Sequence, residues 1–316
     1  MAAVTPAPHR RGPLWLRQLG LGLAFVSPWL VGLLAFRAYP IAASFWYSLH
    51  EFRGLGQMRF VGLENYWWML TKDLDFWTGV SNTLVYTLMA VPTGIIAALT
   101  VAIALNVRLR GQPIYRTIYF LPVLVPDVAL SIVWLQMFNP QYGLVNTIIE
   151  GLAKLVGLDI VGPGWLASEV WAKPTLVLMH LWLIGHPIVI YLAALQDVPQ
   201  ELLDAAAVDG ANWLRRTLHI TIPMITPAIF FQLITSLIGA MQIFSQPWVI
   251  TGGTGQPAQS LLFYSMVLYR KGFQEFNMGL GTAMAWMLFI AISLFTYLLF
   301  KSSARWVYYG GAEERR

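Results

Sequence analysis

Six long apolar segments constrain this chain more than any other feature of its sequence. A membrane-spanning helix needs roughly 20 consecutive apolar residues to cross a hydrocarbon layer about 30 Å thick. Segments of that kind lie at residues 19–49, 83–105, 114–138, 174–195, 222–250 and 280–300. Apolar residues make up 57% of the 316-residue chain and charged residues only 11%, whereas an ordinary soluble domain is roughly 25% charged. The sequence therefore predicts an all-α integral membrane protein with about six transmembrane helices.

The Lys and Arg positions predict how these helices are oriented. If the N-terminus is cytoplasmic, twelve of the 20 Lys and Arg residues fall in inner segments and seven in outer loops, as the positive-inside rule favours. We therefore expect both termini to be cytoplasmic, with an N-terminal segment at 1–18, a membrane domain at 19–304 and a tail at 305–316. The outer loop at 139–173 is predicted to contain a short helix near Val145–Leu155.

The sequence lacks the residues that several kinds of chemistry require. The chain has no Cys, so it has no thiolate metal site and no cysteine nucleophile. None of its Lys residues follows a Gly, so the Gly-x4-Gly-Lys motif that cradles nucleotide phosphates is absent. The basic residues are scattered rather than gathered into a nucleic-acid-binding stripe. The Asp and Glu residues are dispersed too, whereas a polytopic membrane transferase would need them clustered, so such an enzyme is the weaker alternative. Neither a catalytic residue nor a metal site is predicted.

The inner loop at 197–223 has the most specific pattern in the chain. Pro199 suits a first helical position, and the apolar side chains that follow it share one side of a short helix. Gly210 can adopt positive φ and end that helix, and residues 211–219 are expected to form a second one. Such an amphipathic helix could sit in another protein's groove or lie on the membrane surface, and the residues alone leave both open.

This loop resembles the EAA loop of ABC-importer permeases, in which Glu-Ala-Ala is followed by Gly and then by Ile-x-Leu-Pro. Asp204-Ala205-Ala206 stands at the EAA position, Gly210 follows at the expected distance, and Ile220-Thr221-Ile222-Pro223 closes the pattern. Asp replaces Glu and Ile replaces Leu, which keeps charge and bulk. The flanking residues Leu195–Pro199 and Thr251-Gly252-Gly253 resemble the maltose-type carbohydrate permeases in particular.

The resemblance implies that solute translocation and ATP hydrolysis are carried out by different subunits. It predicts an ABC type I importer permease fold in a bacterial inner membrane, paired with a second permease, two cytoplasmic ATPase subunits and an external solute-binding protein. ATP and Mg would bind to the ATPases, and this chain would hold no cofactor. The ATPase-coupling residues that it implies are Asp204, Ala205, Ala206, Asp209, Gly210 and Pro223.

Two ionisable residues lie within the apolar segments, where such groups are functional candidates. Arg37 is expected near the outer interface, where its long side chain can snorkel to water. Asp127 could line an aqueous path, pair with Arg37 or have only a structural role. Pro122 and Pro126 predict a bend beside it.

The resemblance also implies a carbohydrate pathway. In maltose-type permeases, the sugar meets a Gly-x-Pro region and a polar stretch of the next span, which here correspond to Gly185, His186, Gln242, Phe244, Ser245 and Gln246. Amides and hydroxyls bind sugars well, although polar residues also hold spans together. A phosphate cargo such as glycerol phosphate would favour additional Lys or Arg residues in the spans, where only Arg37 is available. We therefore prefer a neutral sugar as the cargo over a phosphate, a polyamine or a peptide.

Overall fold

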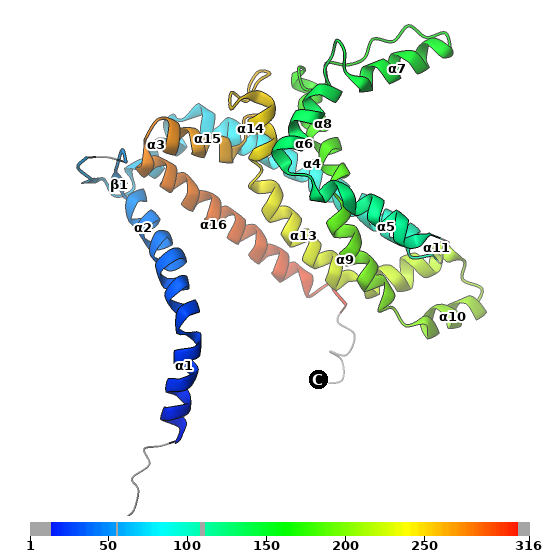
Figure 1. Ribbon diagram of the computed structural model, residues 1–316, viewed down its shortest axis with the longest axis horizontal. Helices are drawn as coiled ribbons and strands as arrows, with labels where there is room; N and C mark the ends of the chain where they lie inside the picture. Colours follow the sequence, from blue (N-terminus) through cyan, green and yellow to red (C-terminus); the bar gives the residue numbers. More distant parts are fainter. Residues whose placement is uncertain (1–13, 55, 108–110, 309–316) are drawn as a thin grey trace, which may run out of the picture.

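A computed structural model describes residues 14–54, 56–107 and 111–308 of the chain, in which the regular secondary structure is helical apart from one two-stranded ribbon (Figure 1). The predicted cytoplasmic tails therefore lie largely outside the described residues. In chain order the elements are α1 (Leu14–Leu33), a π-helical turn (Leu34–Ala38), α2 (Tyr39–Ser48), β1 (His50–Glu51), β2 (Arg59–Phe60), α3 (Glu64–Lys72), α4 (Leu74–Leu105), α5 (Gln112–Phe120), a 3-10 turn (Leu121–Leu124), α6 (Asp127–Met137), α7 (Leu144–Leu155), α8 (Glu169–Trp182), α9 (Gly185–Gln196), α10 (Gln200–Val208), α11 (Trp213–Arg216), a π-helical turn (Thr217–Thr221), α12 (Ile222–Met224), α13 (Thr226–Met241), α14 (Ser245–Thr251), α15 (Tyr264–Tyr269), a π-helical turn (Arg270–Gln274) and α16 (Met278–Ser303).

Four helical stretches are long and apolar enough to cross a membrane, namely Gln18–Ser48, Leu74–Leu105, Thr226–Thr251 and Met278–Ser303. Two bent pairs raise the count to six if each is one span: Gln112–Leu124 with Asp127–Met137, and Glu169–Trp182 with Gly185–Gln196. Each predicted apolar segment overlaps one of these six. The bend expected near Pro122 and Pro126 is present at 97°, and the short helix expected near Val145–Leu155 is α7.

The long helix α4 is the centre of the bundle, in contact with α8, α9, α13 and α15 (Figure 1). Its buried residues Ala90, Gly94, Ala98 and Ala102 recur every fourth position, so they form a stripe of small side chains along one face. Small residues let neighbouring backbones approach closely, which is how helices associate in lipid. By contrast, α1 and α2 form an arm that stands apart from most of the bundle (Figure 1).

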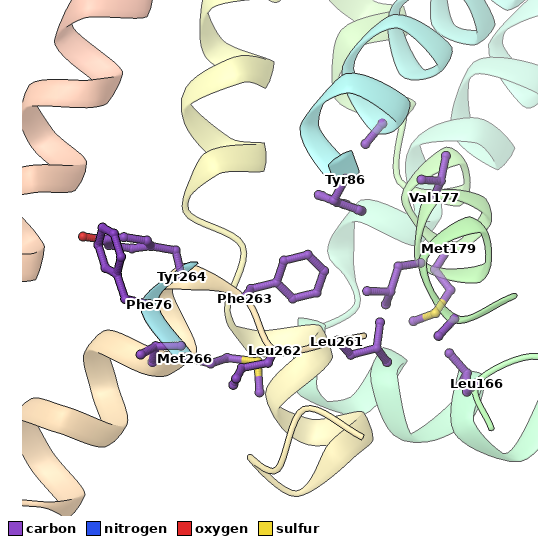
Figure 2. Close-up of a cluster of buried hydrophobic side chains, with 14 of the residues drawn as sticks. Phe76, Tyr86, Leu166, Val177, Met179, Leu261, Leu262, Phe263, Tyr264 and Met266 are labelled. Carbon is purple, nitrogen blue, oxygen red and sulfur yellow. The ribbon is translucent and has the colours of Figure 1, made fainter. Parts of the chain in front are cut away.

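Two apolar clusters pack against opposite ends of α4. One gathers Phe76 and Tyr86 of α4 with α8 and the segment Leu261–Val267, and the other gathers Ala98 and Leu105 with α9 and Ile225. Figure 2 shows the first cluster, in which Phe263 points toward Tyr86. Tyr86 of the first cluster also lines a cavity, together with Gly94 and Ile95 further along α4.

Polar side chains of α4 form hydrogen bonds with the segment that contributes Leu261–Val267 to the first cluster. Asn82 is 7% exposed, and its amide donates to the carbonyl oxygens of Gln259 at 2.7 Å and Leu262 at 2.9 Å. The Thr83 hydroxyl accepts a hydrogen bond from the Tyr264 backbone at 3.0 Å. Burial, followed by the influence of Tyr66, raises the pKa of the Tyr264 hydroxyl. That hydroxyl therefore stays neutral as it donates to the Met284 carbonyl at 2.8 Å.

Ion pairs tie the start of α4 to the turn before α16. Lys271 lies 3.7 Å from Asp73 and 3.3 Å from Glu275, and Arg270 lies 3.5 Å from Asp75. Asp73 is also the N-cap of α4, because its carboxylate accepts from the Phe76 amide at 3.3 Å. This cap explains why α4 begins at Leu74, well before the segment expected at 83–105.

Replacing Asn82 by Leu is expected to lower the thermal denaturation midpoint of the purified protein in detergent. The substitution leaves two backbone carbonyls without their donor, and a buried polar group without a partner costs about 1–3 kcal/mol. Thr78→Ala is the matched control, because Thr78 is only half-buried on the same helix and its hydroxyl bonds only to the Leu74 carbonyl. Equal midpoints for the two variants would show that Asn82 does not hold this segment.

Candidate functional site

Three interruptions of helical structure border one cavity of about 510 Å³. They are the 97° break before α6, the 50° break between α8 and α9, and the non-helical residues between α13 and α14. The lining consists of Tyr86, Gly94, Ile95, Asp127, His180, Leu183, Ile184, His186, Pro187, Ile190, Phe231, Gln232, Thr235, Ser236, Gly239, Ala240, Gln242, Ile243, Phe244, Ser245 and Gln246. Backbone groups freed at a helix break cannot face lipid, but they are tolerated where they line a water-filled space.

The cavity brings together six of the predicted pathway residues, which come from segments far apart in the chain: Asp127, His186, Gln242, Phe244, Ser245 and Gln246. Asp127 is the first residue of α6, directly after the sharp break. A carboxylate is favoured there by the positive end of the helix dipole. Among the described residues it forms no ion pair, with Arg37 or with any other cation.

Gly185 lies beside the cavity but does not line it. A Cβ at this position would collide with the Tyr119 carbonyl oxygen and lie 3.0 Å from the Phe120 Cα. The absence of a side chain therefore lets the start of α9 approach the end of α5. In the structure, Gly185 acts through this close helix packing, which holds the neighbouring His186 in its place.

The polar side chains of the cavity lining are largely without partners inside the chain. In the part that the structure describes, the side chains of His186, Gln242, Ser245 and Gln246 make no hydrogen bond, whereas Gln232 donates to Ser236 at 2.9 Å. Gln232 and Ser236 thus form a hydrogen-bonded pair within α13. The other four side chains have free hydrogen-bonding capacity toward the cavity, toward a neighbouring subunit or toward water.

Sequence reasoning missed part of the lining. Gln232, Thr235, Ser236 and Gly239 all lie on the cavity side of α13, and their recurrence every three or four residues in an apolar segment is the signal that could have identified them. His180 also lines the cavity. It packs against Gly94, where a Cβ would lie 3.1 Å from the His180 Nε2.

The charge of the cavity follows from the same residues. The described lining has one carboxylate, that of Asp127, and no Lys or Arg. No group of three His, Cys, Asp or Glu among the described residues could hold a metal ion. Aromatic faces lie at one side, where Phe244 stacks on Trp248 with ring centroids 5.2 Å apart. The arrangement can therefore hydrogen-bond and stack against a polar, uncharged molecule.

The loop at 197–223 lies at the opposite end of the bundle from α7 and β1 (Figure 1). Pro199 is the residue before α10 rather than its first helical residue, since its ψ is 124°. Gly210 has φ +79°, as expected for the residue that ends the helix. The predicted second helix is present as α11, which continues through a π-helical turn to α12, the short helix that contains Pro223.

Most of α10 is exposed. Leu203 and Ala206 are the residues that turn partly inward, whereas Asp204, Ala205 and Asp209 are exposed. Leu202 is 46% exposed and Val208 89% exposed, so apolar and acidic side chains share the outer surface of this helix. Gln200 donates to the Asp204 carboxylate at 3.0 Å, which orients the acid on that surface.

Comparison with known proteins places these features in a family. Residues 75–308 match the family described as "Binding-protein-dependent transport system inner membrane component". The chain is 36% identical to a probable ABC transporter permease of Bacillus subtilis (strain 168), over 93% of each chain. It is 34% identical to the lactose transport system permease of Rhizobium radiobacter, over 88% of this chain and 92% of that one.

Two further proteins resemble the chain, one in sequence and one in fold. The sn-glycerol-3-phosphate transport system permease of Yersinia pestis is 30% identical over 93% of this chain and 96% of its own. A subunit of a bacterial alginate ABC transporter, solved with an alginate-pentasaccharide-bound periplasmic protein, matches the fold. Its TM-score is 0.78 at 20% identity, with 92% of this chain and 96% of that one covered. This chain therefore belongs to the binding-protein-dependent inner-membrane components of ABC transporters, as a multi-pass, non-catalytic permease subunit.

Proposed function

We propose that this permease subunit moves a neutral carbohydrate through the cavity bordered by its three helix breaks. It would do so together with a second permease, two cytoplasmic ATPase subunits and an external solute-binding protein. Both termini and the loop at 197–223 would then be cytoplasmic. ATP and Mg would bind to the ATPase subunits, so that this chain supplies the pathway and the coupling surface but no cofactor.

The free hydrogen-bonding groups of the cavity are the observation that supports a carbohydrate most. His186, Gln242, Ser245 and Gln246 present donors and acceptors that no described side chain satisfies. Sugars offer hydroxyl groups to such side chains and apolar ring faces to an aromatic side chain such as Phe244. A relative of similar length transports lactose, by its name.

Glycerol phosphate is the second candidate, because another relative is named for it. The charge of the cavity argues against this cargo. A phosphate group would lie near the Asp127 carboxylate with no Lys or Arg in the described lining, and desolvated like charges repel strongly. Arg37 does not alter this balance, because it lies on the arm formed by α1 and α2 rather than among the lining residues.

The exposed surface of α10 supports the coupling role. The ATP-driven closure of the ATPases has to be transmitted to the membrane spans, and a short helix that contacts both the ATPases and the spans can transmit that movement. Here α10 is held through Leu203 and Ala206, while its acidic and apolar residues face outward. A helix that offers apolar anchors and acids on one surface suits a groove in a partner protein.

The cargo can be tested with the assembled transporter in proteoliposomes supplied with ATP and its solute-binding protein. We expect accumulation of a neutral sugar from a radiolabelled panel of lactose and maltose, and none of sn-glycerol 3-phosphate. Accumulation of sn-glycerol 3-phosphate without either sugar would contradict the proposal.

The pathway can be tested with Gln246→Leu and Asp127→Asn in the same assay. Loss of one hydrogen bond to the sugar, worth about 0.5–1.5 kcal/mol, is expected to raise the KM for uptake about twofold to tenfold in Gln246→Leu. Asp127→Asn is expected to change the selectivity between neutral and anionic solutes. Gln274→Leu is the control, because Gln274 is exposed and lies outside the cavity lining. Unchanged KM and selectivity in both variants would exclude these side chains from the path.

The coupling surface can be tested with Asp204→Lys and Gly210→Asp, which are expected to abolish uptake while the protein stays in the membrane. Reversal of charge at Asp204 and a carboxylate at Gly210 would both disturb an ATPase groove. Gly157→Asp is a matched control, because Gly157 also has positive φ, at +75°, and a Cβ added there would meet no other atom within 4 Å. It therefore has the same backbone strain at the far end of the bundle. Normal uptake and normal ATPase association in both α10 variants would overturn the docking assignment.

A further inference from the structure

The helix α7 has an apolar side that the described part of the protein leaves uncovered. Leu144, Ile148, Leu152 and Leu155 follow one another at helical spacing and are 54%, 51%, 60% and 83% exposed. They form a continuous aliphatic stripe, which we call the α7 stripe. An amphipathic helix whose apolar stripe remains uncovered is the signature of a helix that rests in a membrane interface.

The other side of α7 is fixed by the loop that follows it. Asn146 is 3% exposed. It donates to the Pro163 carbonyl at 3.2 Å and accepts from the Trp165 indole at 2.6 Å. The Gly162 amide donates to the Glu150 carboxylate at 3.0 Å. These bonds hold the loop firmly on the Asn146 side, so α7 has a defined rotation about its own axis.

That rotation decides where the α7 stripe points. At about 100° per residue, Leu155 lies about 180° around the helix from Asn146, so the stripe is opposite the covering loop. In Figure 1, α7 projects sideways from the upper end of the bundle with this loop above it, and the spans extend below. The stripe therefore faces the same side of α7 as the membrane-spanning bundle.

We infer that α7 is an in-plane membrane anchor, whose stripe inserts into the lipid interface at the end of the bundle opposite α10. The neighbouring helix α6, which contacts α7, also exposes apolar side chains, because Val128 and Ile132 are 53% and 51% exposed. This inference rests on the membrane location of the chain and is independent of its cargo.

The chemistry of the α7 stripe favours lipid over a protein partner. Its four side chains are all branched aliphatics, without the aromatic and Arg residues that enrich the energetic centres of protein interfaces. Lys154 and Thr147 border the stripe on its polar flank, where their side chains can reach lipid headgroups and water. An interface with the solute-binding protein would also have to release in each transport cycle, which such a stripe does not favour.

The experiment uses the fact that the chain has no Cys. Leu152→Cys and Lys154→Cys are made separately in the complete transporter, with any cysteines of the other subunits replaced, and are labelled with an environment-sensitive fluorophore in lipid nanodiscs. We expect the label at 152 to emit at shorter wavelength and to be quenched at least threefold more by spin-labelled lipid than the label at 154. We also expect the label at 152 to be unaffected by addition of the solute-binding protein.

Two results would overturn the inference. Equal quenching at the two positions would show that the stripe does not enter the lipid. A label at 152 that is shielded from spin-labelled lipid, and changes on addition of the binding protein or cross-links to the second permease, would make the stripe a protein interface. Ile148→Cys provides a second stripe position, so a labelling artefact at one site cannot decide the outcome.

Discussion

The requirement that every backbone polar group be hydrogen-bonded in the membrane governs this structure. Continuous helices meet it without help, and α4 does so over 32 residues. Helical structure is interrupted before α6, before α9 and between α13 and α14. All three breaks border the same cavity. Interruptions that would be costly against lipid are thus gathered where water and a polar solute can satisfy them.

The packing around α4 makes that arrangement possible. Small residues along one face allow neighbouring helices to approach closely, and Gly94 leaves the space that His180 occupies. At one end, Asn82 and Thr83 hold the segment before α15, and the ion pairs of Asp73 and Asp75 hold the turn before α16. These contacts position Tyr86, Gly94 and Ile95 of α4, which form part of the cavity wall.

The two ends of the molecule have different tasks under the proposed function. At one end, α10 is attached through a few residues and presents acids and apolar side chains outward, as a surface for a moving partner. At the other end, α7 is fixed by hydrogen bonds from Asn146 and Glu150. An anchored end and an end that presents a docking surface suit a subunit that must convert movement of its partners into rearrangement of its spans.

The sequence by itself determined the membrane class, the six apolar segments, the bend near Pro122 and Pro126, and the loop that resembles the EAA loop. These features depend on local composition and spacing, which a linear pattern contains. It also predicted six residues that line the cavity: Asp127 because an ionisable side chain in an apolar segment is conspicuous, and the other five because their segments resemble those of the maltose-type permeases. Only the tertiary structure decided that Gly185 serves helix packing, that His180 and Gln232 face the cavity, and which side of α7 is left uncovered. Those outcomes depend on which backbones meet across the bundle, and contacts between distant segments leave no local signal in the chain.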